Sequence, residues 1–468
     1  MPTAAVSRPL AAGSRALIVS GHRLFRHPLR AGPTGTGPRQ SSNGTLIPLP
    51  LTRGAYLKVK ASSNGHNPSS NGTAPLNGTA AVAEPQTLPY TSTKGLIFGT
   101  GETGAWDEAS VGSPVVRLWM DGAEQRWVMW YSGAELEFPS FGSVAPASGS
   151  IGVAVSSDGV NWVRGTGANS GGRAQSERDA DVGRLMEPNE DSWWWMDTCH
   201  LAVSDVQVFG DMGDGAGVFW MFYQGADYEA LPVPGSMTES LGEEDLEGLR
   251  MRPGLAMSQD GKNWARIEGD HHTGALFDVG EAGEWDELFI GHPQVVSVGP
   301  KELRMYYHSY DLNEDRYKVG VAVSDNGFRW QKKGVVFEGG KEEGAFDGRG
   351  AAARHVIRNP DNGDYLMFYE AVGSDDTRSI GLAVSKNGLS GWKRMDSPLL
   401  SPSGEQGSWD CAGVGAPRAV PMANSWRLYY SGRSTSDKPW NGIGLALSAA
   451  DGPKFEGMSS TFTRRQGS

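Results

Sequence analysis

The 468-residue sequence has little cysteine and no long apolar run. Its only two cysteines are Cys199 and Cys411, which excludes a disulfide-rich scaffold and favours a reducing compartment. No stretch approaches the roughly 18 consecutive apolar residues of a transmembrane helix, so no membrane span is expected. The formal net charge of -12 argues against nucleic-acid binding, which depends on neutralising phosphates. His271-His272 has no third ligand nearby, so neither a metal nor another cofactor is expected.

Acidic residues are missing from the first part of the chain. Residues 1–83 contain no Asp or Glu, whereas they carry seven Arg and two Lys. An Arg-rich, Ser-rich, acid-free leader is typical of a transit peptide. We therefore expect a plastid transit peptide over residues 1–60, a disordered polar linker over 61–93, and a mature protein in the chloroplast stroma. A mitochondrial leader and a basic tail without a targeting role are the alternatives.

Three sequence elements recur five times from about residue 95 onward. An apolar run with an Asp-Gly or Asn-Gly turn reads IGVAVSSDGVNW at 151–162 and returns at 253–264, 319–330, 380–392 and 443–455. An aromatic Met/Tyr-rich run precedes each copy. An aromatic residue near an Asp opens each repeat, at Trp106-Asp107, Trp195-Met196-Asp197, Trp285-Asp286, Phe346-Asp347 and Trp409-Asp410. A similar run begins seven residues after every one of these Asp residues, so chance is a poor explanation.

Each repeat is expected to form four short strands, because Asp-Gly and Asn-Gly between apolar runs are strong hairpin signals. Repeated four-stranded units predict propeller blades. The expected fold is all-β: a five-bladed β-propeller over residues 94–458, followed by a disordered tail over 459–468. The predicted blades span 105–164, 193–268, 284–337, 345–400 and 408–456, with the N-terminal strand 95–98 closing the last. The long insertions fall on one face, where a binding site is expected.

The repeats resemble the five-bladed propellers of the arabinanase, levansucrase and invertase superfamily, which includes glycoside hydrolase families 43 and 32. This resemblance implies three carboxylates around a central channel, matched here by Asp107, Asp197 and Glu287 as the catalytic residues of a glycosidase. In the same families the hairpin is structural, so Asp158 and Asp260 are expected to fix hairpins. Family 43 often has an Asp directly before the Pro of the first inner strand, where this chain has Ser113. Because Asp347 and Asp410 occupy the equivalent place, the five Asp residues are alternatively a repeated turn device.

Residues that break the fivefold pattern are the candidates for ligand binding. They are Glu108, His200, His292, Arg349, Arg354, Arg418 and Trp194. Trp194 is expected to form a sugar-stacking platform together with Trp193. Arginine binds carboxylate or phosphate through paired hydrogen bonds, so a carbohydrate or an anionic small molecule is the expected ligand at the channel mouth. The leading hypothesis is a glycoside hydrolase-like protein. The alternative is a catalytically inactive propeller that serves as a plastid binding or assembly protein and binds a protein partner. A lyase or transferase acting on a small metabolite is the third hypothesis.

Overall fold

The computed structural model describes residues 90–121, 124–135, 148–165, 182–210, 217–232, 235, 245–436, 439–449 and 462–466. The predicted transit peptide and almost all of the predicted linker lie outside these residues. Contacts divide the chain into Met1–Thr45 and Leu46–Ser468, and every described residue belongs to the second unit. In the described part of the chain, no helix is long and apolar enough to span a membrane.

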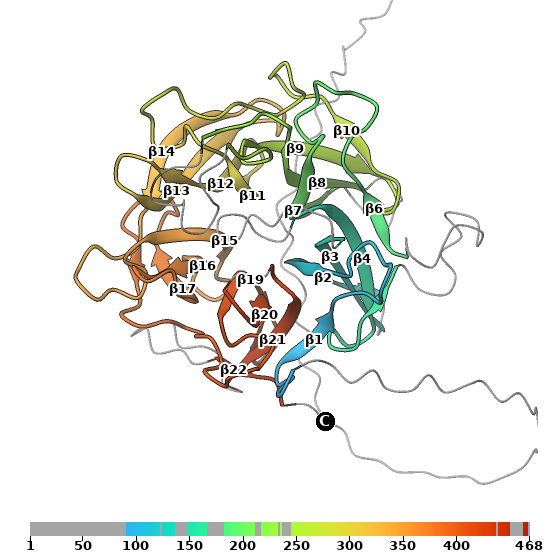
Figure 1. Ribbon diagram of the computed structural model, residues 1–468, viewed down its shortest axis with the longest axis vertical. Helices are drawn as coiled ribbons and strands as arrows, with labels where there is room; N and C mark the ends of the chain where they lie inside the picture. The colour runs from blue at the N-terminus through green and yellow to red at the C-terminus, as the bar shows by residue number, and fades with distance from the viewer. Residues whose placement is uncertain are drawn as a thin grey trace, which may run out of the picture. The chain divides into compact units, whose positions relative to one another are not determined.

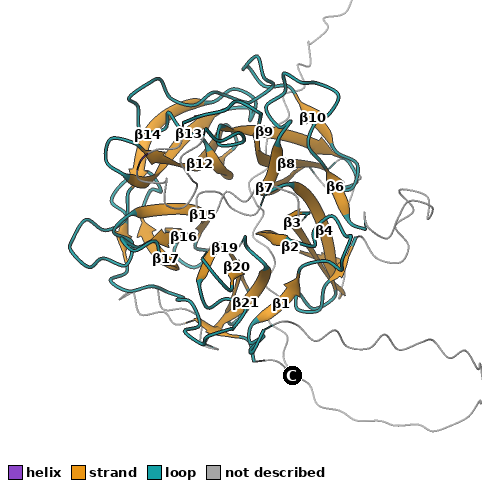
Figure 2. Ribbon diagram, viewed as in Figure 1, coloured by secondary structure: helices purple, strands orange, loops and turns teal. Residues whose placement is uncertain are grey.

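The described residues form an all-β fold without an α-helix, in which five groups of consecutive antiparallel strands follow one another (Figures 1 and 2). The first group is β2 (Ser110–Asp121), β3 (Glu124–Ala134), β4 (Ser150–Ser156), β5 (Val163–Arg164) and β6 (Arg184–Met186). The second is β7 (His200–Phe209), β8 (Val218–Ala226), β9 (Met251–Ser258) and β10 (Ala265–Ile267). The third is β11 (Gly291–Gly299), β12 (Glu302–Asp311), β13 (Arg316–Ser324) and β14 (Gln331–Phe337). The fourth is β15 (Gly350–Arg358), β16 (Tyr365–Val372), β17 (Arg378–Ser385) and β18 (Lys393–Arg394). The fifth is β19 (Gly413–Pro421), β20 (Trp426–Arg433), β21 (Gly442–Ser448) and β22 (Phe462–Arg464), joined by β1 (Leu96–Gly99).

The first strands of the five groups lie nearest the centre of Figure 1. Strand β2 contacts β7, β7 contacts β11, β11 contacts β15, β15 contacts β19, and β19 contacts β2. Hydrogen bonding divides the strands into sheets of 13, four and five strands, none of which closes on itself. Each innermost strand carries a β-bulge near its start, for example between Gly112 and Val115 in β2 and between Gly291 and Gln294 in β11. Because a bulge redirects the side chains around it, these five bulges determine which side chains face the centre of the fold.

Glycine lets large aromatic rings pack flat against the strands. Trp106 is buried and stacks on Tyr131 with ring centroids 5.4 Å apart. A Cβ added at Gly152 would lie 2.3 Å from the Trp106 ring, and Trp285 and Trp409 approach glycines of their own groups in the same way. The high glycine and tryptophan content of the sequence therefore reflects one packing contact that several groups repeat.

The expected structural role of the hairpin aspartates is confirmed. The Oδ1 atom of Asp158 accepts hydrogen bonds from the backbone N–H groups of Val160 and Asn161, both at 2.8 Å, and from Ser156 Oγ at 2.9 Å. Burial alone would raise the pKa of Asp158, but these hydrogen bonds hold it below its usual range. Asp260 makes the same set of bonds in the second group, so both carboxylates stabilise turns.

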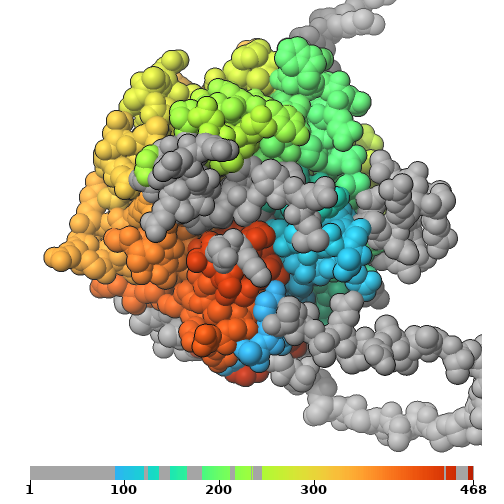
Figure 3. Space-filling model, in the orientation of Figure 1, coloured from blue at the N-terminus to red at the C-terminus, as the bar shows by residue number. Residues whose placement is uncertain are grey.

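The expectation of a disordered tail over residues 459–468 is wrong for Phe462–Arg464, which form β22. Strand β22 pairs with one half of β21, where Phe462 lies opposite Ser448. Strand β1 pairs with the other half, where Leu96 lies opposite Gly444. Figure 3 shows the blue N-terminal segment beside the orange-red C-terminal strands. A three-residue strand has almost no sequence signal of its own, because its backbone partner supplies most of its stability.

Candidate functional site

The carboxylate of Asp107, a predicted catalytic residue, is fully buried and bound inside its own group of strands. Its Oδ2 atom accepts hydrogen bonds from Tyr131 Oη and from Arg164 Nε, both at 2.9 Å. Tyr131 comes from the second strand of the group and Arg164 from its outer strand. The Asp107 side chain thus links the outer strand of the group to the turn that precedes the first strand, which we call the entry turn.

The same arrangement of an aspartate, a tyrosine and a cation recurs around the fold. Arg266 Nε lies 2.8 Å from Asp197 Oδ2, Lys332 Nζ lies 2.9 Å from Asp286, and Arg464 Nε lies 2.7 Å from Asp410. The remaining cation contact is between Arg394 and Asp347, at 3.6 Å. The tyrosine hydroxyl groups are those of Tyr223, Tyr307, Tyr369 and Tyr430. Asp107 and Asp197 therefore make the contacts that recur in groups for which no catalytic role was predicted.

Glu108, a predicted ligand-binding residue, and Glu287, a predicted catalytic residue, make matching backbone contacts. Glu108 Oε2 accepts a hydrogen bond from Gly104 N at 2.6 Å, and Glu287 Oε2 accepts one from Gly283 N at 2.6 Å. The two glycines have φ values of +86° and +88°, a conformation that favours glycine. Each glutamate thus supports the turn that precedes its own Trp-Asp pair.

A second set of polar residues lies on the innermost strands, around Asp205 of β7. The Asp205 carboxylate is fully buried and lies 3.0 Å from Arg418 and 3.4 Å from Arg117. It also accepts hydrogen bonds from Gln207 Nε2 at 2.6 Å and from Val295 N at 3.2 Å. These partners come from the first, second, third and fifth groups. Asp205 therefore joins four groups of strands at the centre.

Arg354 and His292 belong to the same central region. Arg354 is fully buried and lies 3.2 Å from His308 Nδ1. Burial lowers the pKa of Arg354 to about 9, against the opposing effect of Asp205, so the guanidinium is still charged at pH 7. Burial, with Arg354 and Arg418 nearby, holds the pKa of His292 well below its usual range, so this imidazole is neutral. We call Arg117, Asp205, His292, Arg354, His355 and Arg418 the axial cluster.

Several buried polar atoms at the bulges have no hydrogen-bond partner among the described residues. They are Ser113 Oγ, Ser204 Oγ, His292 Nδ1 and Arg354 Nε. Ser113 and His292 have φ values of 51° and 52°, left-handed conformations that few non-glycine residues adopt. Buried polar groups are usually paired, so unpaired atoms together with strained backbone point to a functional role for the bulges.

Several buried charged residues are not among the site residues predicted from the sequence. The most prominent are Asp205 and the pair formed by Glu370 and Arg378. Glu370 Oε1 lies 2.7 Å from Arg378, and its other oxygen accepts a hydrogen bond from Ala416 N at 3.1 Å. The available signal was a charged residue at a position that is apolar in another repeat, since Asp205 takes the place that Val115 occupies in the first repeat.

The other predicted ligand-binding residues do not join the axial cluster through any described contact. His200 Nε2 lies 2.7 Å from the carbonyl of Gly248, and burial lowers the pKa of this histidine to about 4. Arg349 pairs with Asp376 at 3.0 Å. Trp193 and Trp194 are exposed and meet edge to face with centroids 6.1 Å apart. Both cysteines are free thiols, and no group of potential metal ligands occurs among the described residues.

Known proteins resemble this chain in sequence only weakly. No protein-family model matches the sequence. A 1,2-beta-oligomannan phosphorylase of Thermoanaerobacter sp. (strain X514) is 24% identical over 181 residues, which is 38% of this chain and 52% of that protein. The chain thus matches about half the length of this curated relative.

Solved structures resemble the chain more extensively. A thermostable family-43 glycoside hydrolase has a TM-score of 0.51 at 16% identity, over 78% of this chain and 97% of the other. A structure from work on the GH130 family of mannoside phosphorylases and its hydrolases has a TM-score of 0.49 at 13% identity, over 80% and 96%. The described strands have the fold of the propeller glycoside hydrolases, and the predicted resemblance is confirmed at the level of fold.

Proposed function

We propose that the protein binds a small sugar-containing ligand with an anionic group at the axial cluster, and that its ring of aspartates is architectural rather than hydrolytic. The observation that carries this proposal is the set of unpartnered buried atoms at the bulges, of which His292 lies near both Arg354 and Arg418. Guanidinium groups suit phosphate or carboxylate, while serine and imidazole suit sugar hydroxyl groups. The Arg117 side chain, 31% exposed, offers a point of approach.

The axial cluster favours binding over hydrolysis because it has a single acidic member. Glycoside hydrolysis ordinarily uses two carboxyl groups, one as acid and one as base or nucleophile. Asp205 contacts two arginines, and the axial cluster contains no second carboxyl group to act with it. A second candidate is phosphorolysis, in which an oxygen of HPO4²⁻ bonds to the anomeric carbon, the glycosidic C–O bond breaks, and the leaving sugar oxygen takes the proton that the phosphate brings. The weak likeness to an oligomannan phosphorylase supports that candidate.

We further propose that the five groups of strands are five blades, with β1 and β22 together completing the fifth. Contacts between the first and last groups support this arrangement. Ser113 N donates a hydrogen bond to Ser431 Oγ at 2.9 Å, and Ser110 Oγ donates one to the carbonyl of Trp440 at 3.0 Å. These bonds hold the two ends of the repeat array together.

Replacing His292 with Asn is expected to weaken binding of a sugar phosphate about tenfold, because one hydrogen bond to the ligand is lost. Asn tolerates the left-handed backbone at this position. Calorimetric titration of the full chain with inorganic phosphate, mannose 1-phosphate and mannose 6-phosphate measures the effect. His272→Asn, in an exposed loop, is the matched control. Absence of binding by all three probes would contradict the proposal, as would equal binding by both variants.

A pair of glutamate variants tests the architectural role of the entry turns. Glu287→Gln and Glu108→Gln are expected to lower Tm by similar small amounts and to leave phosphate and sugar-phosphate binding unchanged. Both variants are assayed for release of reducing sugar from β-1,2-mannobiose, with and without phosphate. If the wild type hydrolyses this substrate and Glu287→Gln alone abolishes turnover, the glycosidase hypothesis is correct and the architectural one is wrong.

Import into plastids is likewise our proposal, and it rests on the composition of residues 1–83. Residues 1–60 fused to a fluorescent reporter are expected to direct the reporter into the plastid stroma. Confocal microscopy with a stromal marker measures the location of the reporter. The same segment with its seven arginines replaced by glutamine is the control. Accumulation in mitochondria or secretion of the reporter would contradict the proposal.

A further inference from the structure

The fourth repeat differs from the others at the aromatic residue beside its ring aspartate. Three repeats have tryptophan directly before this aspartate, at Trp106, Trp285 and Trp409, whereas the second has Met196 and the fourth has Phe346. In the first group the indole is buried against Gly152, and its Nε1 donates a hydrogen bond to the carbonyl of Val182 at 3.1 Å. A phenyl ring is smaller than an indole and has no N–H, so it fills less of the equivalent space.

The packing around Phe346 shows the consequence of this difference. Gly152, Gly320 and Gly444 each lie against the tryptophan of their own group, but the nearest side chain to Gly381 is that of Tyr369. Phe346 is only partly buried, and the Arg394 guanidinium lies 5.5 Å from its ring centroid. The missing indole therefore leaves space beside the phenyl ring.

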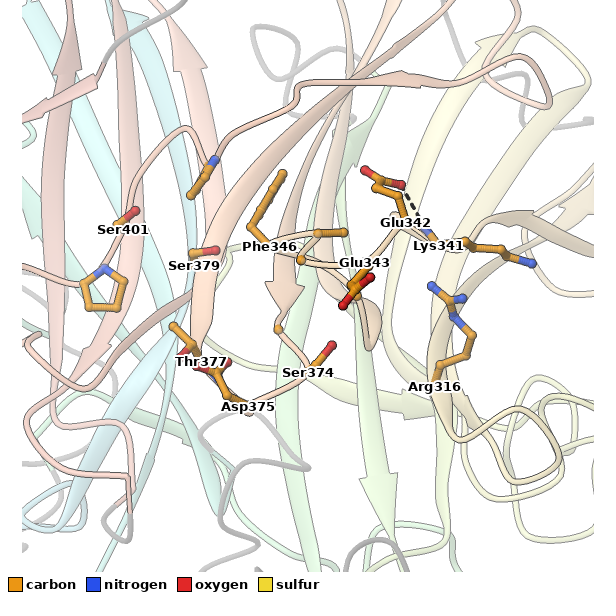
Figure 4. Close-up of a pocket in the computed structure, with 16 residues that line it drawn as sticks. Arg316, Lys341, Glu342, Glu343, Phe346, Ser374, Asp375, Thr377, Ser379 and Ser401 are labelled. Carbon is orange, nitrogen blue, oxygen red and sulfur yellow. Dashed lines mark hydrogen bonds between the residues drawn. The ribbon is translucent and has the colours of Figure 1, made fainter.

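A cavity of about 730 Å³ occupies this region (Figure 4). Phe346 lies in the middle of the view, between Arg316 and Lys341 on one side and Ser379 and Ser401 on the other. The volume of the cavity falls within the roughly 300–1,000 Å³ typical of small-ligand sites. The lining comes from the third and fourth groups and from the segment that follows β18.

The side chains of this cavity suit a neutral polyhydroxylated ligand. Lys341 pairs with Glu338, and Glu342 pairs with Arg394, so neither is an uncompensated charge. Hydroxyl groups are supplied by Ser374, Thr377, Ser379 and Ser401, and carboxylates by Glu343 and Asp375. Carboxylates accept hydrogen bonds from sugar hydroxyl groups but repel anions, which argues against a phosphate here.

One buried donor points independently to a ligand at this position. Arg316 is 8% exposed and lines the cavity. It donates to the carbonyls of Glu338 at 2.6 Å and Gly340 at 3.0 Å through one nitrogen. Its Nε has no hydrogen-bond partner among the described residues. A buried N–H of this kind is costly unless it is satisfied, and a ligand oxygen in the cavity would satisfy it.

We propose that the cavity beside Phe346 is a second saccharide-binding site, one that takes a neutral pyranose. The aliphatic face of the sugar packs on the phenyl ring, and its hydroxyl groups meet the surrounding hydroxyls, carboxylates and Arg316. This site is separate from the axial cluster and does not depend on the function proposed for that cluster.

Phe346→Trp is the decisive variant, because it introduces the tryptophan that three other repeats have at this position and fills the cavity. Saturation-transfer NMR on the full chain with D-mannose, D-glucose, D-galactose and cellobiose measures binding. At least one sugar is expected to bind the wild type, and its signal is expected to fall at least tenfold in Phe346→Trp, with Tm unchanged or raised. Asp375→Asn, at an exposed position, is a second variant that should weaken binding without affecting the fold.

Controls separate this site from the axial cluster. His292→Asn and Trp193→Ala are expected to retain the neutral-sugar signal, while Phe346→Trp is expected to retain sugar-phosphate binding. The proposal is overturned if none of the four sugars binds the wild type, or if the signal is the same in wild type, Phe346→Trp and Asp375→Asn. It is also overturned if His292→Asn alone removes the signal.

Discussion

Replacement of Asp205 with Ala is expected to destabilise the fold by about 3–5 kcal/mol, because breaking a buried ion pair leaves its partner charges uncompensated. Arg418 would lose a carboxylate 3.0 Å away, and Arg117 one at 3.4 Å. Val295 N and the Gln207 amide would lose their acceptor as well. Since these partners come from four groups of strands, the loss should affect the whole fold rather than one hairpin.

Denaturant unfolding monitored by tryptophan fluorescence measures the loss of stability. Asp270→Ala is the control, since Asp270 forms an exposed ion pair with Arg329 at 3.5 Å, and such pairs contribute little. Asp205→Asn should be less damaging than Asp205→Ala, because an amide oxygen can still accept from Val295 N. A change below about 1 kcal/mol for Asp205→Ala would show that the central charges do not hold the groups together.

Ending the chain after residue 461 is expected to lower stability by about 3–5 kcal/mol, the typical effect of removing one partner of a buried charge. This truncation removes β22 and with it Arg464, whose Nε lies 2.7 Å from the fully buried Asp410. It also exposes half of the β21 edge, where Phe462 had paired with Ser448. The exposed edge should increase aggregation.

Thermal unfolding and light scattering measure these two effects. A chain ending after residue 466 keeps β22 and is the matched control, and Arg464→Ala separates the ion pair from the strand. Deletion of residues 91–99 removes β1 from the same edge and should be comparably damaging. If the chains ending at 461 and 466 melt at the same temperature, β22 does not complete the fifth group and our account of closure is wrong.

The fivefold repeat could be predicted from the sequence because its signals are local. Turn residues such as Asp158 bond to backbone groups two or three residues away, so their role is the same in any fold that contains the hairpin. Apolar runs and aromatic-Asp pairs recur at fixed spacing, and this spacing is sufficient to locate most strands. The three residues of β22 carried no such signal, because their stability comes from a partner strand and from Asp410, which lies 54 residues from Arg464.

The candidate site was harder to predict because equal spacing does not distinguish a repeated structural contact from a catalytic one. Asp107 and Asp197 occupy the positions that the family resemblance assigns to catalysis, yet both bind a tyrosine and an arginine of their own group. His292, Arg354 and Arg418 break the repeat, which makes them candidates from the sequence, and the structure does bring these three together.

By itself, the sequence determined the strand pattern, the hairpins and the resemblance to propeller glycoside hydrolases, since each depends on contacts between near neighbours in the chain. Only the tertiary structure decided which charges share the centre. Asp205 and Arg418 are 213 residues apart in the sequence and meet because their strands start beside the same axis. The space beside Phe346 is of the same kind: one aromatic substitution is visible in the sequence, but the cavity it leaves depends on residues from four separate segments.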